Sequence, residues 1–230
     1  MWTRKDLKTN AKTALKSNYW KAVLAAVVMT MFTSASGSSN SSNVSEGLQE
    51  ASSTLGTMDP STALAAVGVV LTACLLGVLI SVIFSVFVVN PFQVGAQKLF
   101  LNCKDNSAKC GDVLYAFKNS YMNIVKGMFM KNLFIALWSL LLVVPGIVKT
   151  YEYRMVSYLL AENPGMSWKE AIAKSKEMMN GQKWNAFVLD LSFIGWHLLS
   201  ACTCGILGLF YVMPYALLTN TELYYALKTE

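Results

Sequence analysis

Four ionisable side chains in the second half of the chain could pair with one another in apolar surroundings. Lys149 and Glu152 are three residues apart, so they can pair on one face of a helix. Arg154 points away from Glu152 and needs another partner, either Asp190 or a backbone carbonyl freed at a proline. The spacing predicts either a polar centre that binds anionic head groups or relays ions, or an ion-pair network that fixes helix register. We favour the network, because nothing shows that a pathway reaches these groups.

A fifth ionisable group, His197, follows Asp190 by seven residues, so the two share one face of a helix. Histidine titrates near neutrality, which makes this pair suited to a proton relay. The alternative places Asp190 near the cytoplasmic interface and makes His197 a hydrogen-bonded packing residue. We favour this second interpretation.

Enzyme chemistry has little support in the sequence. His197 is the only histidine, which excludes zinc sites that need two or three imidazoles. The chain has no nucleophile elbow, no phosphate-binding loop and no dinucleotide fingerprint. We therefore expect a non-enzymatic protein without a metal or another cofactor.

The composition indicates that lipid is the solvent for much of this chain. Hydrophobic residues make up 54% of the 230, and charged residues only 14%, against about 25% in an ordinary soluble domain. The formal net charge is +6, and 16 of the 19 Lys and Arg fall in the segments 1–21, 98–131 and 169–183. Basic residues gather in this way on the cytoplasmic side of membrane proteins. No nucleic-acid-binding motif accompanies them, so we expect no nucleic-acid partner.

Apolar runs predict an all-α protein, a polytopic membrane helix bundle of about six transmembrane helices with amphipathic surface helices. The predicted spans begin at Trp20 and continue over 62–89, 132–144, 144–161, 184–200 and a last run that ends near 224. The stretch 144–161 carries charges and is either a full span or a re-entrant hairpin; both return the chain to the cytoplasm. The charge distribution then places both termini on the cytoplasmic side of the plasma membrane.

The ends of the chain and its loops complete the expected organisation. Residues 1–19 carry regularly spaced lysines and predict a basic amphipathic helix on an anionic membrane surface. Residues 20–230 are expected to form a single membrane-embedded domain. Its segment 33–61 is rich in Ser, Gly and Asn and contains no Lys or Arg, which predicts a polar extracytoplasmic loop.

Small residues recur every four positions in the strongest apolar run, at Ala73, Gly77, Ser81 and Ser85. Such a stripe allows two helices to approach closely in lipid. We favour packing within the bundle; the alternative is association with a second copy or another membrane protein.

The residues from Leu137 to Leu199 carry a resemblance to a known family. They read LWSLLLVVPGIVKTYEYRMVSYLLAENPGMSWKEAIAKSKEMMNGQKWNAFVLDLSFIGWHLL, and Pro214-Tyr215 and the ending from Glu222 to Leu227 follow. This pattern resembles the domain of unknown function 975 family. The resemblance implies a bacterial multi-pass membrane protein and supplies no activity.

Two functions from different classes follow from these patterns. The first is a non-enzymatic membrane scaffold or accessory factor that contacts the lipid bilayer, anionic lipid head groups or partner proteins. The second is a small transporter or channel built around the intramembrane polar residues. A water-accessible cavity lined by those side chains favours transport, and a dry network favours the scaffold.

Overall fold

The structure is a computed structural model, and it describes residues 2–37, 49, 60–104, 107–203 and 205–229. Within these ranges every regular element is helical and none is a strand, which confirms the expected all-α class. The chain forms two compact units, one made of Met1–Thr30 with Asn90–Glu230 and the other of Met31–Val89. Each unit is described separately below.

The smaller unit is dominated by α4 (Pro60–Phe84), which follows the last residues of α2 (Tyr19–Gly37). Helix α4 contains no charged residue, and its 25 residues rise about 37 Å, more than the roughly 30 Å of a hydrocarbon core. The predicted loop over 33–61 lies mostly outside the described residues, although α2 continues to Gly37. Because α4 is apolar on every side, its sequence matches a lipid environment.

The small-residue stripe lies along α4 and is uncovered within this unit. A Cβ added at Gly77 would meet nothing within 4 Å, and Ala73 is exposed while Ser81 and Ser85 are half-buried. Packing of this stripe against another helix therefore stays a prediction.

Two prolines inside helical segments each follow a turn of π-helix. Ser85–Val89 is a π turn before Asn90-Pro91, and Gly208–Val212 is a π turn before Met213-Pro214. The pair Asn90-Pro91 predicts a break or a bend, and the helix is unbroken there, from Leu64 to Lys104. Proline removes one backbone donor from the ladder, and the wider π turn accommodates this local change in hydrogen bonding.

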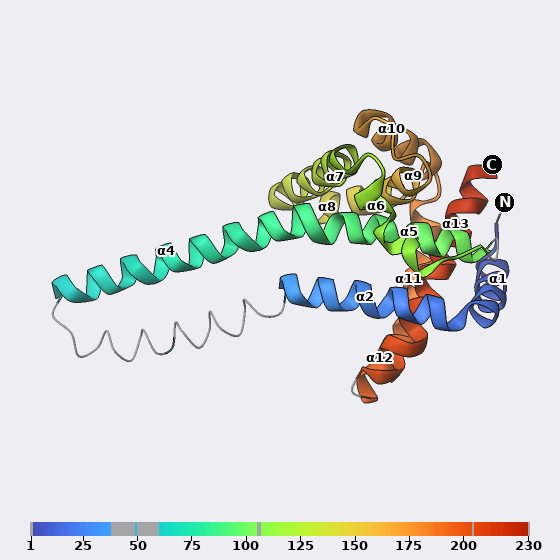
Figure 1. The fold of residues 1–230 in the computed structure, drawn as a ribbon, viewed down its shortest axis with the longest axis horizontal. Helices are drawn as coiled ribbons and strands as arrows, with labels where there is room; N and C mark the ends of the chain where they lie inside the picture. The colour runs from blue at the N-terminus through green and yellow to red at the C-terminus, as the bar shows by residue number, and fades with distance from the viewer. Residues whose placement is uncertain (1, 38–48, 50–59, 105–106, 204, 230) are drawn as a thin grey trace. The chain divides into compact units, whose positions relative to one another are not determined.

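The larger unit is a series of mostly short helices around one core. Helices α1 and α13, the first and the last of the chain, lie on the same side of it (Figure 1). Its elements are α1 (Arg4–Ser17), α2 as far as Thr30, α5 (Asn90–Lys104), η2 (Cys110–Leu114), α6 (Tyr115–Lys118), α7 (Tyr121–Leu141), α8 (Val143–Glu152), α9 (Val156–Glu162), α10 (Trp168–Met178), α11 (Lys183–Leu191), α12 (Ile194–Cys202), η3 (Gly208–Val212) and α13 (Met213–Thr229).

The core of this unit is built around α9, whose residues from Val156 to Ala161 are all buried. Leu99 from α5, Met128 from α7 and Tyr224 from α13 are also fully buried and belong to the same hydrophobic cluster. Full burial of each such side chain stabilises the fold by roughly 1.5–3 kcal/mol. This core holds the break between α8 and α9 in place.

Helix α1 confirms the predicted amphipathic segment, but protein covers its apolar face. Thr3 caps the helix by accepting a hydrogen bond from the Asp6 amide at 3.3 Å. Leu7, Ala11 and Leu15 are buried, and α1 packs mainly on α13. The apolar stripe was interpreted as a membrane-facing surface; in the structure it completes the core, and the basic side chains remain outside.

Helices α7 and α8 form an antiparallel hairpin that turns at Leu142, which has an extended backbone. A Cβ at Gly146 would lie 2.8 Å from the Cα of Ser139, so only glycine permits this close crossing. At the turn Leu140 is 86% exposed and Val144 is 73% exposed. The pair Pro145-Gly146 predicts a helix stop or turn at this point; the turn instead lies at Leu142, and Pro145-Gly146 falls within α8.

Candidate functional site

Arg154 lies in the break between α8 and α9 and joins three parts of the larger unit. Its guanidinium donates to both carboxylate oxygens of Asp190, on α11, at 2.7 and 2.8 Å. It also donates to the side-chain oxygen of Asn220, on α13, at 2.6 Å. A two-point hydrogen bond between guanidinium and carboxylate fixes orientation as well as distance. The partner anticipated for Arg154 is therefore Asp190, and Asn220 adds a third contact.

Tyr151 completes this group, which we call the Arg154 cluster (Tyr151, Arg154, Asp190 and Asn220). The Tyr151 hydroxyl donates to Asp190 at 2.9 Å, and the guanidinium lies 5.6 Å from the centre of the Tyr151 ring. The Arg154 side chain is only 16% exposed, whereas that of Asp190 is 40% exposed. The cluster thus has one buried charge and one that reaches the surface.

Lys149 and Glu152 form the predicted pair, and Lys183 adds a second cation. The Lys149 ammonium lies 2.7 Å from the Glu152 carboxylate, and the Lys183 ammonium lies 3.7 Å from the same carboxylate. Lys149 also lies 5.3 Å from the centre of the Trp138 ring on α7. These three charged residues, the Glu152 cluster, connect α8 with α11.

Ser175 on α10 satisfies the backbone where α8 and α9 separate. Its hydroxyl donates to the Glu152 carbonyl at 2.8 Å and accepts from the Met155 amide at 3.2 Å. Both groups are buried, and unpaired backbone groups there would destabilise the fold. The sequence carries no signal that would have assigned this role to Ser175.

His197 lies apart from these clusters. It is exposed on α12, which begins after a two-residue interruption of the helix that carries Asp190. Within the described ranges its imidazole has no recorded hydrogen bond or ion pair, so the structure does not join it to Asp190. The same ranges contain no group of three or more His, Cys, Asp or Glu placed to hold a metal ion.

Two hollows adjoin the Arg154 cluster. One of about 330 Å³ is lined by Ile147, Thr150, Tyr151, Arg154 and Asp190. The other, of about 210 Å³, is lined by Val144, Ile147, Val148, Tyr151, Lys183, Trp184 and Phe187. They share Ile147 and Tyr151 as lining residues, and we call these two neighbouring hollows between α8 and α11 together the α8–α11 groove.

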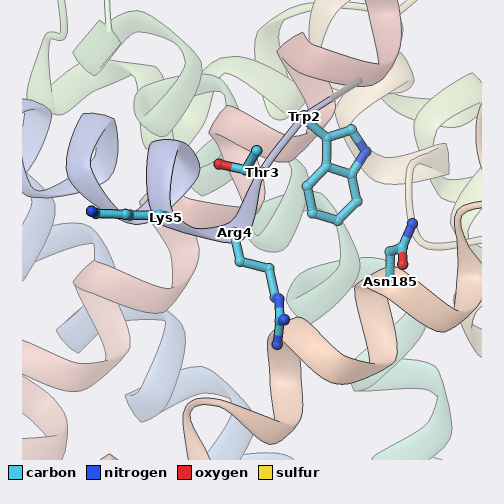
Figure 2. A pocket seen from close by; sticks show the side chains of 5 residues that line it. All are labelled: Trp2, Thr3, Arg4, Lys5 and Asn185. Atoms are coloured by element: carbon cyan, nitrogen blue, oxygen red, sulfur yellow. The ribbon is translucent and has the colours of Figure 1, made fainter.

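A separate and larger hollow of about 580 Å³ lies at the start of α1, where Trp2, Thr3, Arg4 and Lys5 face Asn185 of α11. The indole nitrogen of Trp2 is buried and has no hydrogen-bond partner among the residues that the structure describes. Figure 2 shows Lys5 pointing away from the indole, while Arg4 runs beneath it. The hollow therefore does not direct both cations toward one ligand.

Glu162 at the end of α9 ties the core to the C-terminal helix. It accepts a hydrogen bond from the Tyr224 hydroxyl at 2.6 Å and pairs with Lys228. Burial disfavours its charged form, but the Lys228 ammonium and the Tyr224 hydroxyl outweigh burial and lower the pKa of this carboxyl. Glu162 thus stays ionised at neutral pH and holds α13 in place.

Comparison with known families matches most of this chain. The family model described as Protein of unknown function (DUF975) matches residues 71–230. The chain belongs to this family. The match to the DUF975 family begins within α4 and includes every residue of the Arg154 and Glu152 clusters, whereas α1 lies before it. No curated protein and no solved structure matches the chain.

Proposed function

We propose that this DUF975 protein is a multi-pass integral membrane protein that acts as a non-enzymatic scaffold or accessory factor in the plasma membrane. Three described helices are long and apolar enough to cross a membrane: Leu64–Lys104, Tyr121–Leu141 and Lys183–Cys202. Their apolar side chains are largely exposed, and soluble monomers rarely expose apolar patches beyond a few hundred Å². Lipid is the solvent that this surface fits.

Our proposed topology has six apolar segments in the membrane and keeps both termini in the cytoplasm. The segments α2, α4, α11 with α12, and η3 with the start of α13 cross it, and α7 and α8 enter it together as a hairpin. The basic segments 1–21, 98–131 and 169–183 then lie inside, as the positive-inside rule requires.

Within this topology we propose that the α7–α8 hairpin is re-entrant. Residues 132–148 are the only uncharged stretch available to it, and the chain turns back at Leu142. Helix α8 has 10 residues, which rise about 15 Å, half of a hydrocarbon core of about 30 Å. The opening turns of α7 are buried in the core at Ile124, Val125 and Met128. Two full crossings would need more apolar chain than the hairpin has.

The scaffold role rests on one observation, the three hydrogen bonds by which the Arg154 guanidinium is held to Asp190 and Asn220. A transport site needs charged groups that exchange partners, whereas here three elements are fastened by one side chain. Glu152 is likewise paired with Lys149 and Lys183. Such pairing favours a structural network.

A transporter or channel is the second candidate, and the hollow beside Arg154 is the observation that favours it. Arg154 and Asp190 both line this space of about 330 Å³, so solutes or water could reach two of the charged groups. Glu152 and His197 do not line it.

Liposome reconstitution with an internal pH-sensitive dye separates the two candidates. Wild type, Glu152→Gln and Arg154→Gln would be compared, with Lys169→Gln as the control because Lys169 lies on α10, outside both clusters. A scaffold predicts that all four preparations hold a proton or anion gradient equally well. A leak in wild type and in the control that disappears in either cluster variant would replace the scaffold with transport, provided that gel filtration shows folded protein.

A further inference from the structure

The α8–α11 groove is apolar at one end and polar at the other. Its apolar end is formed by side chains such as Val144, Val148, Trp184 and Phe187. Its polar end contains Arg154 and Asp190 with Thr150. Because Lys183 also lines the apolar hollow, a ligand there can combine an apolar part with an anionic head at this lysine.

The Lys183 ammonium at this groove is held only loosely by its partner carboxylate. It lines the apolar hollow, and its ammonium lies 3.7 Å from Glu152, too far for a hydrogen bond. Glu152 is held more closely by Lys149, at 2.7 Å. In the part of the chain that the structure describes, the Lys183 ammonium thus retains donors for another partner.

The local charge balance favours an anionic head. Lys149, Arg154 and Lys183 stand against the two carboxylates Glu152 and Asp190. The surroundings of the groove therefore carry a net positive charge. Trp184, next to Lys183, is 70% exposed, and exposed tryptophan beside lysine is typical of the interface between membrane and water.

The lining side chains of the groove favour a lipid over a peptide as the ligand. A peptide would bring backbone N–H and C=O groups that need hydrogen-bond partners when buried. Among its lining side chains, the apolar end offers the Lys183 ammonium, the Trp184 indole N–H and the Tyr151 hydroxyl, and this hydroxyl already donates to Asp190. An acyl chain makes no such demand.

We propose that the α8–α11 groove binds one anionic phospholipid, with an acyl chain between Val148 and Phe187 and the phosphate at Lys183. The proposal rests on the membrane embedding proposed above. It adds a defined site, a ligand class and a cation that recognises the head group. Binding there would let lipid composition influence how α8 and α11 pack.

Native mass spectrometry of the full chain in detergent tests this proposal with phosphatidylglycerol and phosphatidylcholine of identical acyl chains. Wild type should retain phosphatidylglycerol about tenfold more strongly, in line with a hydrogen bond to a charged group. Lys183→Gln should remove the preference and keep weak binding of both lipids. Val148→Trp, which fills the groove, should reduce retention of both.

Matched controls lie outside the groove. Lys169→Gln removes a lysine from α10, and Leu198→Trp adds bulk to α12, where Leu198 is 65% exposed. Both should bind like wild type. Equal retention of the two lipids by wild type, or unchanged binding by both groove variants, would overturn the proposal. A shift from dimer to monomer in Val148→Trp would assign the groove to a second copy instead.

Extraction of membranes with alkaline carbonate separates failure of this site from failure of the proposed embedding. Release of the wild-type chain by carbonate contradicts the embedding itself. If the chain stays with the membrane and phosphatidylglycerol is not preferred, only the lipid site is lost.

Discussion

Gly95→Ala is expected to destabilise the larger unit by about 3 kcal/mol or more, because overpacking against backbone cannot relax cheaply. A Cβ at Gly95 would lie 1.9 Å from the carbonyl oxygen of Val113 and 2.6 Å from its carbonyl carbon. The segment η2 cannot easily withdraw, since the Asp112 carboxylate accepts from Asn102 at 2.8 Å and from the Lys109 amide at 3.0 Å. Thermal unfolding in detergent, followed by tryptophan fluorescence, measures the loss.

Gly111→Ala is the matched control, because Gly111 lies in the same η2 segment and a Cβ there would meet nothing within 4 Å. Its melting temperature should equal that of wild type or rise slightly, as alanine restricts the unfolded chain. Equal melting temperatures for the Gly95 variant and wild type would show that α5 and η2 do not pack as described.

Arg154→Met is expected to destabilise the protein by about 2–3 kcal/mol. Removing one member of a buried ion pair costs roughly 3–5 kcal/mol, and the 40% exposure of Asp190 lets water solvate part of the charge that is left. Asn220 also loses the 2.6 Å hydrogen bond that it accepts. Chemical denaturation of the detergent-solubilised variant measures this change.

A double variant shows whether the effect belongs to the Arg154–Asp190 pair. Arg154→Met combined with Asp190→Leu removes both charges, so it should recover a large part of the stability lost by either single change. Strictly additive losses would mean that the two residues do not act as a pair. Recovered stability together with unchanged liposome tightness would support the scaffold further.

Spacing and charge were sufficient to predict the central contacts. Lys149 and Glu152 pair because they are three residues apart. Arg154 needed a partner that lies away from Glu152, and Asp190 was one of the two named for it, beside a backbone carbonyl freed at a proline. Such predictions succeed when a charge in apolar surroundings has few partners to choose from.

Contacts that depend on the meeting of distant helices could not be predicted in the same way. Asn220 and Lys183 reach their clusters because the chain breaks after Glu152 and redirects α9 into the core. Ser175 stabilises that break by hydrogen bonding to the backbone on both sides of it, at the Glu152 carbonyl and the Met155 amide. No periodicity in the sequence marks these three residues.

The amphipathicity of α1 and the position of Pro91 predicted only part of the structure, because tertiary packing decides the rest. The apolar stripe of α1 predicts a buried face, but hydropathy does not distinguish lipid from the surface of α13 as its cover. Pro91 predicted a break or a bend, and a π turn over Ser85–Val89 lets the helix continue without a break. Local patterns identify which surface is apolar, whereas tertiary packing decides what meets it.

Side-specific cysteine labelling tests the membrane topology most directly. Two single-cysteine proteins would be exposed in intact cells to a membrane-impermeant maleimide, one that keeps Cys202 and one that carries Leu142→Cys. Cys202 is exposed at the end of α12, so it should react from outside. The cysteine at 142, at the turn of the re-entrant hairpin, should stay unlabelled until the membrane is dissolved. Labelling at 142 as rapid as at Cys202 would contradict the re-entrant hairpin, and an unreactive Cys202 would contradict the proposed orientation.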